Sequence, residues 1–236
     1  MAKVKRQIIA MGGGGFTAEP GSPLERYVLA QTRKANPSVC FLATATGDAP
    51  TYVAKFYEAF SKLRCRPSHV PLFERTPDLR KALLSQDVIY VGGGNTKSML
   101  AVWREWRLPE ILRQAWNSGT ILAGVSAGAI CWFQSGVTDS WAEELKPLRC
   151  LGWLPGACCP HYDGEAERRP AVRRFVDKRI VPEILALDDR AAAHFVGRNL
   201  LRVVVSRPKA GAYRVRKEKG KVVEVPLPVT RLEKFR

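Results

Sequence analysis

The chain has 236 residues, of which 46% are hydrophobic, so it can bury one sizeable core. No apolar run approaches the ~18 residues of a membrane helix, and the basic start leads into only a short apolar run, so we expect a cytoplasmic protein with no membrane partner. The net charge is +16, but the basic residues are spread along the chain. This balance does not favour nucleic-acid binding, and it could attract an acidic substrate.

The six cysteines contain no Cys-x-x-Cys pair. That spacing is typical of zinc sites and of redox dithiols, so its absence predicts neither. We therefore expect no metal and no cofactor.

The first half of the chain alternates between strand and helix patterns. A parallel sheet with helices on both faces is typical of this alternation. The predicted strands are 5–11, 38–46, 68–74, 87–93 and 120–125, and the predicted helices are 22–35, 51–63, 77–86 and 96 onward.

After residue 140 the pattern is looser. We expect a loop through 158–164, a basic helix over 166–180, a strand over 183–189, and antiparallel β structure over 199–227 with a hairpin turn at Lys219-Gly220. No repeat or linker divides the chain. The sequence thus predicts a single α/β domain, 1–236, with a mostly parallel sheet sandwiched by helices and a C-terminal antiparallel β extension.

Two glycine clusters follow predicted strands. Gly12 to Gly15 do not fit the dinucleotide fingerprint, because the sixth position is Thr17 or Ala18 instead of glycine. A flexible turn at the carboxyl edge of the sheet, where open α/β sheets bind ligands, is the better interpretation. The second cluster, 92–94, opens a helix and is either a tight turn or a set of backbone N–H groups facing a pocket.

Gly124, Ser126 and Gly128 form a Gly-x-Ser-x-Gly motif between a strand and a helix. In a nucleophile elbow the serine occupies a strained turn, so its flanking residues must be small. The next N–H, from Ala127, then points toward a developing oxyanion. The alternative is a small residue that fills an ordinary strand-to-helix corner.

A serine nucleophile needs a base, and the chain has three histidines. His161 lies in a loop downstream of the serine and is the best candidate, whereas His69 and His194 are more typical of structural residues. The acid that orients the imidazole is Asp139, Asp163, Asp188 or Asp189. The end of a strand favours the last two, but spacing does not separate them from Asp139.

The segments "GGGNT", "GVSAGAICWF", "GVTDS" and "CPHYDGE" together resemble the peptidase E family of serine peptidases, family S51, which contains aspartyl dipeptidases and is related to the cyanophycinases. This resemblance implies a fold like that of class I glutamine amidotransferases. It also implies Ser126 as nucleophile and His161 as base. Gly93 and Gly94 would join Ala127 in the oxyanion hole.

The resemblance offers two positions for the acid, matched by Asp139 and by Asp189, which stands where the family has glutamate. It also implies that Asn95, Arg168 and Arg169 bind the substrate. We therefore expect a serine exopeptidase that hydrolyses dipeptides or short peptides, with an acidic first residue, through an acyl-enzyme. An amidase or isopeptidase, or a non-catalytic binding protein on the same scaffold, is the alternative, and homodimer formation stays open.

Overall fold

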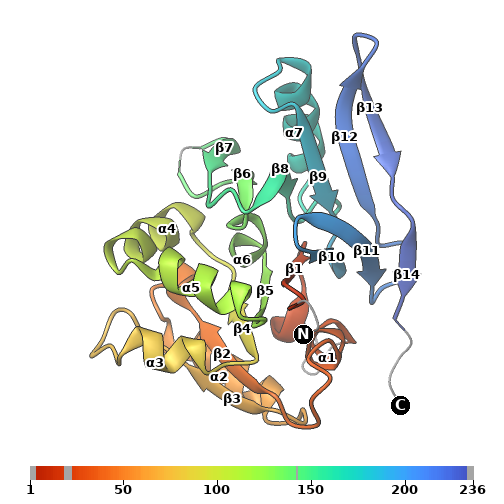
Figure 1. The fold of residues 1–236 in the computed structure, drawn as a ribbon. Coiled ribbons are helices and arrows are strands. Elements are labelled where there is room, and N and C mark those ends of the chain that lie inside the picture. The colour runs from red at the N-terminus through yellow and green to blue at the C-terminus, as the bar shows by residue number, and fades with distance from the viewer. Residues whose placement is uncertain (1–3, 19–22, 142, 233–236) are drawn as a thin grey trace.

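The computed structural model describes residues 4–18, 23–141 and 143–232. These residues form two β-sheets with helices packed around them (Figure 1). The α-helices are α1 (Pro23–Ala30), α2 (Pro50–Phe60), α3 (Leu79–Leu84), α4 (Thr96–Glu105), α5 (Leu108–Asn117), α6 (Ala127–Ile130) and α7 (Arg168–Asp177). Ser22, the first residue of the helix predicted over 22–35, lies outside the described residues.

The larger sheet has the strand order β14-β11-β10-β1-β5-β4-β2-β3. Its strands β1, β5, β4, β2 and β3 are parallel, as the alternating pattern predicts. β10 runs antiparallel to β1, and β11 antiparallel to β10. The bounds are β1 (Gln7–Met11), β2 (Ser38–Leu42), β3 (Arg66–His69), β4 (Val88–Val91), β5 (Ile121–Val125), β10 (Ala191–Val196), β11 (Asn199–Val205) and β14 (Val229–Arg231).

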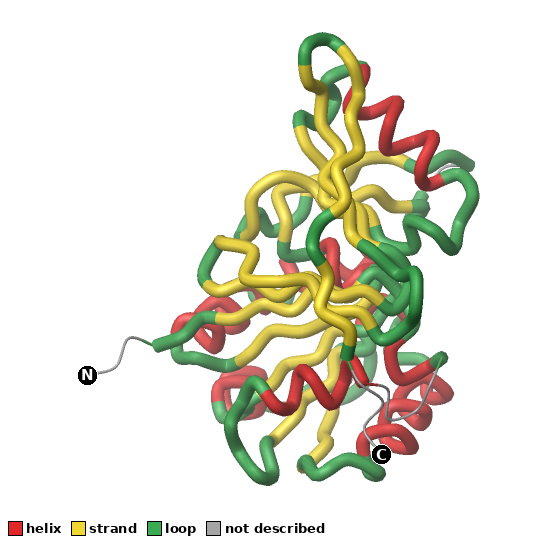
Figure 2. Tube along the Cα trace, turned by 90° about the vertical axis from the view of Figure 1, so that its right-hand side faces the viewer, coloured by secondary structure: helices red, strands yellow, loops and turns green. Residues whose placement is uncertain are grey.

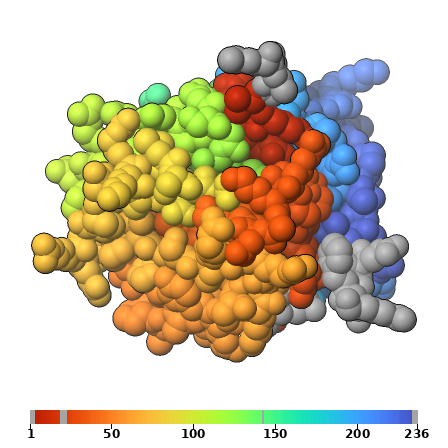
Figure 3. Space-filling model, turned by 60° about the horizontal axis from the view of Figure 1, so that its bottom comes forward, coloured from red at the N-terminus to blue at the C-terminus, as the bar shows by residue number. Residues whose placement is uncertain are grey.

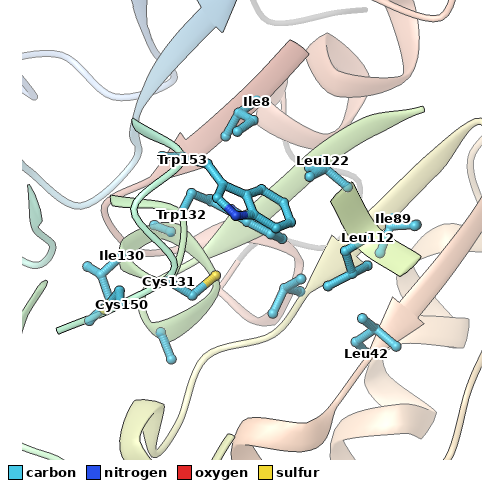
Figure 4. Packing of buried hydrophobic residues seen from close by; sticks show 14 of the residues in the cluster. Ile8, Leu42, Ile89, Leu112, Leu122, Ile130, Cys131, Trp132, Cys150 and Trp153 are labelled. Atoms are coloured by element: carbon cyan, nitrogen blue, oxygen red, sulfur yellow. The ribbon is translucent and has the colours of Figure 1, made fainter. Parts of the chain in front are cut away.

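Both faces of the larger sheet are covered by helices. Every residue of β1, β4 and β5 is buried, which is typical of central parallel strands. On one face, residues such as Ile8, Ile89 and Leu122 pack against α3, α4 and α5, and Figure 4 shows them around Leu112 with Trp132 and Trp153 nearby. On the other face, alternate strand residues pack against α1 and α2.

The smaller sheet has the order β13-β12-β9-β8-β6-β7 and lies above the larger one in Figure 2. β6, β8 and β9 are parallel, whereas β7, β12 and β13 pair in antiparallel fashion. Buried residues of α7 pack on this sheet. Its strands are β6 (Phe133–Thr138), β7 (Lys146–Arg149), β8 (Leu154–Cys159), β9 (Glu183–Leu187), β12 (Ala212–Glu218) and β13 (Lys221–Pro226).

The hairpin predicted at Lys219-Gly220 is confirmed, since Glu218 pairs with Lys221 across a two-residue turn. Both turn residues have positive φ, 46° and 82°, as this kind of hairpin requires. The C-terminal antiparallel extension is therefore present, but its strands are divided between the two sheets.

Several sequence-based expectations differ from the structure, among them the strand predicted over 38–46, which ends at Leu42, and the helix predicted over 22–35, which ends at Ala30. The segment 68–74 is not a strand throughout, because β3 ends at His69, before Pro71. The segment from Phe133 to Cys159 contains three strands of the smaller sheet, whereas the sequence suggested only loose structure there. These strands alternate imperfectly and contain Gly and Pro, so their pattern is weak.

One hydrophobic cluster includes residues of both sheets, among them Leu122, Cys158 and Leu187. The division of the chain into one domain stays a prediction. The face in Figure 3 is formed mainly by the first half of the chain, with the C-terminal strands at one side. Within the described ranges, no helix is long and apolar enough to cross a membrane.

Candidate active site

The candidate site lies where the carboxyl ends of parallel strands from the two sheets meet. The first glycine cluster follows β1, the second follows β4, and Ser126 follows β5, and these three strands are neighbours in the larger sheet. His161 follows β8, and Asp189 follows β9, its neighbour in the smaller sheet. Residues far apart in the sequence therefore reach one edge, where open α/β sheets place their ligands.

Ser126 occupies a strained turn between β5 and α6. Its φ is 55° and its ψ is −112°, a conformation that costs L-residues free energy and recurs at functional sites. Its N–H donates to the Met11 carbonyl at 3.1 Å, which attaches the turn to β1. This backbone has the strained strand-to-helix turn that an elbow requires.

The two glycines of the motif are required by close backbone packing. A Cβ at Gly124 would lie 2.4 Å from the carbonyl oxygen of Gly128. A Cβ at Gly128 would lie 2.2 Å from the carbonyl oxygen of Val91. Packing of the backbone therefore requires glycine at both positions, in addition to any role that the motif has at the site.

His161 is hydrogen-bonded to Asp189, with Nδ1 and Oδ1 2.7 Å apart. The hydrogen bond to His161 lowers the pKa of the Asp189 carboxyl, in spite of its partial burial, so the carboxylate accepts and the imidazole Nδ1 donates. Both side chains remain reachable from solvent, with 23% and 36% exposed. Asp189 thus orients the ring in the way expected of the acid in a triad.

The loop that carries Asp189 is itself held in place. Asp163 accepts a hydrogen bond from the Asp189 N–H at 2.9 Å with its Oδ1, and its Oδ2 pairs with Arg207. Asp163, one of the acids that the sequence left open, therefore supports the Asp189 backbone. Asp188 is buried and accepts from the Gly211 N–H at 2.8 Å.

The first glycine cluster connects this loop to the larger sheet. The His161 N–H donates to the Gly12 carbonyl and the Arg190 N–H to the Gly13 carbonyl, each at 3.0 Å. A Cβ at Gly13 would lie 1.8 Å from Asp189 Oδ1 and 2.5 Å from His161 Nδ1. The cluster thus leaves room for the His–Asp pair, a role that the sequence reading missed although its glycine content was the signal.

Two pockets meet at Ser126 and His161. The first has a volume of about 460 Å³. The second has a volume of about 320 Å³. Besides Ser126 and His161, Asp189, Arg190, Tyr52, Gly14, Gly93 and Gly94 are among the residues that line the first, and Gly94, Asn95, Asp139, Ser140, Glu165 and Arg168 line the second.

The predicted oxyanion-hole residues surround Ser126. A Cβ at Gly93 would lie 3.2 Å from the Ser126 Cβ, so this glycine is directly beside the serine. Its N–H, however, donates to the hydroxyl of Tyr52 at 3.1 Å, a contact that the sequence gave no reason to expect. Ala127 begins α6, and the first N–H groups of a helix have no acceptor within it.

The second pocket contains three more of the predicted residues. Asn95 caps α4 by accepting from the Ser98 N–H at 2.9 Å, and its amide donates to the Ser140 carbonyl at 2.8 Å. Asp139 is exposed in this pocket, whereas the carboxylate that contacts His161 belongs to Asp189. Of the two acids implied by the resemblance, only Asp189 contacts the imidazole.

The two predicted arginines have different surroundings. Arg168 is 3% exposed, and its guanidinium donates to Glu165 at 2.7 Å and to the Val137 carbonyl at 3.0 Å. Arg169 points elsewhere: it pairs with Glu224 at 2.7 Å and lies over the Tyr162 ring. The structure therefore brings Arg168 to the second pocket and does not bring Arg169 there.

The other histidines have structural partners. His194 is fully buried in β10, between the Tyr27 hydroxyl at 2.7 Å and the Gln7 side chain at 3.1 Å. His69, in β3, bonds to the Tyr57 hydroxyl at 2.8 Å. Among the residues that the structure describes, no group of three or more His, Cys, Asp or Glu is arranged to hold a metal ion.

Known proteins resemble this chain, one of them over most of its length. The chain is 50% identical over 226 residues to the protein named uncharacterized peptidase YgaJ of Bacillus subtilis, covering 95% of this chain and 98% of that protein. It is 30% identical over 114 residues to Peptidase E of Shewanella sp. (strain ANA-3), which is 48% of this chain and 47% of that protein.

Solved structures share the fold. The crystal structure of a peptidase from an acI-B1 Actinobacterium superposes with a TM-score of 0.73 at 15% identity, over 96% of each chain. A putative peptidase E of Listeria monocytogenes superposes with a TM-score of 0.61 at 18% identity, over 87% of this chain and all of the other. The fold is the class I glutamine amidotransferase-like α/β arrangement of these peptidases.

The family model described as Peptidase family S51 matches residues 8–203. This range includes both glycine clusters, the elbow, and the loops that carry His161 and Asp189. Together with the relatives above, the match shows that the chain belongs to peptidase family S51.

Proposed function

We propose that this protein is a serine exopeptidase that hydrolyses dipeptides or short peptides with Ser126, His161 and Asp189 as its triad. The 2.7 Å hydrogen bond between His161 Nδ1 and Asp189 Oδ1, in a pocket that Ser126 also lines, is the observation that carries the proposal. Without this pair, Ser126 would have no oriented base to take its hydroxyl proton.

In the proposed reaction, Ser126 Oγ attacks the scissile carbonyl carbon while His161 Nε2 takes the hydroxyl proton. Asp189 accepts the Nδ1 proton in a hydrogen bond, so it keeps Nε2 basic and stabilises the imidazolium that forms. The oxyanion is stabilised by backbone N–H groups near Ala127 and Gly94.

The tetrahedral intermediate then breaks its C–N bond, and His161 gives the proton to the leaving amine. This leaves an ester between Ser126 and the acyl part of the peptide. A water molecule attacks the ester while His161 takes one of its protons, and the serine recovers its proton as the acid product leaves.

The second pocket supports a short substrate with an acidic first residue. Asp139 is an exposed carboxylate there that can pair with an α-ammonium group, and Arg168 supplies a guanidinium to the same lining. A peptide that begins with aspartate carries both complementary charges. Because Arg168 already pairs with Glu165 at 2.7 Å, we expect the preference for Asp over Asn at this position to be modest.

The decisive experiment compares the wild-type protein with Ser126→Ala, and with Ser118→Ala as a matched control that lies away from the site. Hydrolysis of Asp-Leu, Asn-Leu and Ala-Leu is followed by the release of leucine, and a fluorophosphonate probe is located by mass spectrometry. We expect turnover and labelling of Ser126 in the wild type and in the control, and neither in Ser126→Ala.

Other outcomes would replace this proposal. Labelling at Ser126 with turnover of β-aspartyl peptides but no α-dipeptide would indicate an isopeptidase or amidase. No labelling and no turnover would indicate a non-catalytic binding protein on this scaffold. Cytoplasmic location and the absence of nucleic-acid binding stay predictions.

A further inference from the structure

Tyr52 is a side chain of the first pocket that the motifs did not indicate. It lies near the start of α2, and its ring stacks on Phe16 with 5.5 Å between the ring centroids. The ring also meets Phe41 edge-on, with 5.2 Å between the centroids, and it lies against Gly92, where an added Cβ would lie 2.7 Å from the ring. These neighbours hold the ring so that it presents its hydroxyl in one place, at the glycine turn after β4.

The hydroxyl accepts a hydrogen bond from the Gly93 N–H at 3.1 Å. Within the described parts of the chain this is the one hydrogen bond that the Tyr52 hydroxyl makes. A phenol has one proton to donate as well as lone pairs to accept with, so the O–H donor capacity of Tyr52 is not used inside the protein.

Tyr52, Gly93 and Ser126 line the same pocket. Gly93 is in contact with the serine, since its Cβ position is 3.2 Å from the Ser126 Cβ and 3.8 Å from Oγ. The Gly93 N–H, which was expected to stabilise the oxyanion, is thus occupied by a hydroxyl whose own proton is available in the pocket that Ser126 lines.

We propose that Tyr52 is a catalytic residue whose O–H donates a hydrogen bond to the substrate's carbonyl oxygen as this oxygen becomes an oxyanion. Tyr52 thus takes the role that was expected of the Gly93 N–H. This inference rests on the proposed serine peptidase activity. The proton stays on Tyr52 throughout, so no further acid or base is needed.

Two features suit Tyr52 to this role. Burial raises the pKa of its phenol above the ordinary value, so the hydroxyl keeps its proton at neutral pH. In addition, an oxygen that accepts from an N–H becomes a stronger donor, because hydrogen bonds in a chain polarise one another. The Gly93 N–H therefore acts on the oxyanion through Tyr52.

The test is Tyr52→Phe, which removes the hydroxyl and keeps the ring against Phe16 and Gly92. We expect kcat on the preferred dipeptide to fall by about 10²–10³-fold, the usual effect of losing one oxyanion donor, with KM nearly unchanged. Tyr57→Phe is the matched control, because Tyr57 is on the same helix and its hydroxyl contacts His69 outside the pocket. It should leave both constants unchanged.

The rate of Ser126 labelling by the fluorophosphonate gives a second measurement that needs no natural substrate, since the phosphoryl oxygen occupies the same position as the oxyanion. Slower labelling of Tyr52→Phe than of Tyr57→Phe, with equal melting temperatures, supports the proposal. Equal or faster labelling and turnover in Tyr52→Phe overturns it, and faster rates would mean that Tyr52 blocks the Gly93 N–H. A wild-type protein that is not labelled at all would refute the proposed function itself, and this inference with it.

Discussion

Replacing Asp189 with asparagine tests which carboxylate serves His161. The substitution keeps the shape of the side chain but puts an amide 2.7 Å from Nδ1, where a carboxylate now accepts. An amide can donate a hydrogen bond from its NH₂ group to Nδ1, and Nδ1 is then unprotonated. In that tautomer Nε2 already carries a proton, so it cannot accept the proton of Ser126. The ring would be held in the wrong tautomer for catalysis.

In serine peptidases this error lowers kcat by about 10⁴-fold, which corresponds to roughly 5.5 kcal/mol of transition-state stabilisation. We expect a loss of that size for Asp189→Asn. Asp139→Asn is the matched comparison: this exposed carboxylate lies in the second pocket, so we expect a rise in KM and a fall in kcat of no more than about tenfold.

Steady-state kinetics on the preferred dipeptide separates the two variants, and proton NMR adds an independent readout. The hydrogen-bonded Nδ1 proton of His161 should give a low-field resonance in the wild type and in Asp139→Asn, and none in Asp189→Asn. If Asp189→Asn kept kcat within tenfold of the wild type while Asp139→Asn lost it, the assignment of the acid from this hydrogen bond would be refuted.

Two further predictions concern packing and pH. Gly13→Ala should lower kcat by about 10²-fold or more, because its Cβ would lie 1.8 Å from Asp189 Oδ1 and must displace the His–Asp pair. Gly47→Asn is the control and should leave kcat unchanged, because Gly47 has a φ of 66° and open space around it. Equal kinetics for the two variants would contradict the packing argument. Burial lowers the pKa of His194 from 6.5 to about 4. As the pH falls below 6.5, the imidazole therefore binds a proton more readily in the unfolded chain than in the folded one, and the free energy of unfolding decreases until the pH reaches about 4. Between pH 7 and pH 5 this amounts to about 2 kcal/mol, which His194→Asn should remove from the pH dependence of urea unfolding. The comparison with the variant is needed because burial raises the pKa of Asp188 to about 6, which acts with the opposite sign; an unchanged pH dependence in His194→Asn would show that His194 is not the group responsible.

Several elements could be read from the sequence because their causes are local. The strand-helix alternation of residues 5–125 follows from burial of central strands on both faces. The hairpin at Lys219-Gly220 follows from two residues that accept positive φ. Ser126 could be recognised because a strained turn with a close backbone contact on each side needs small residues at set spacings.

Three strands of the smaller sheet, β6, β7 and β8, were missed because they gain their stability from neighbours distant in the chain. β6 and β8 have short, mixed patterns, and they become strands by pairing with each other and with β9. Tertiary context of this kind outweighs local propensity. The location of Arg169 was missed for a similar reason, since its partner Glu224 comes from β13, which is distant in the chain.

By itself, the sequence determined the family, the parallel sheet, the strained turn at Ser126 and the loop that carries His161, because each depends on residue types within a short stretch. Only the tertiary structure decided that Asp189 and not Asp139 contacts His161, and that Tyr52 occupies the Gly93 N–H. Both carboxylates follow strands and satisfy the same spacing, so nothing local distinguishes them. Their distance to the imidazole depends on how β8 and β9 pair and on the room that Gly13 leaves, which are properties of the packed molecule.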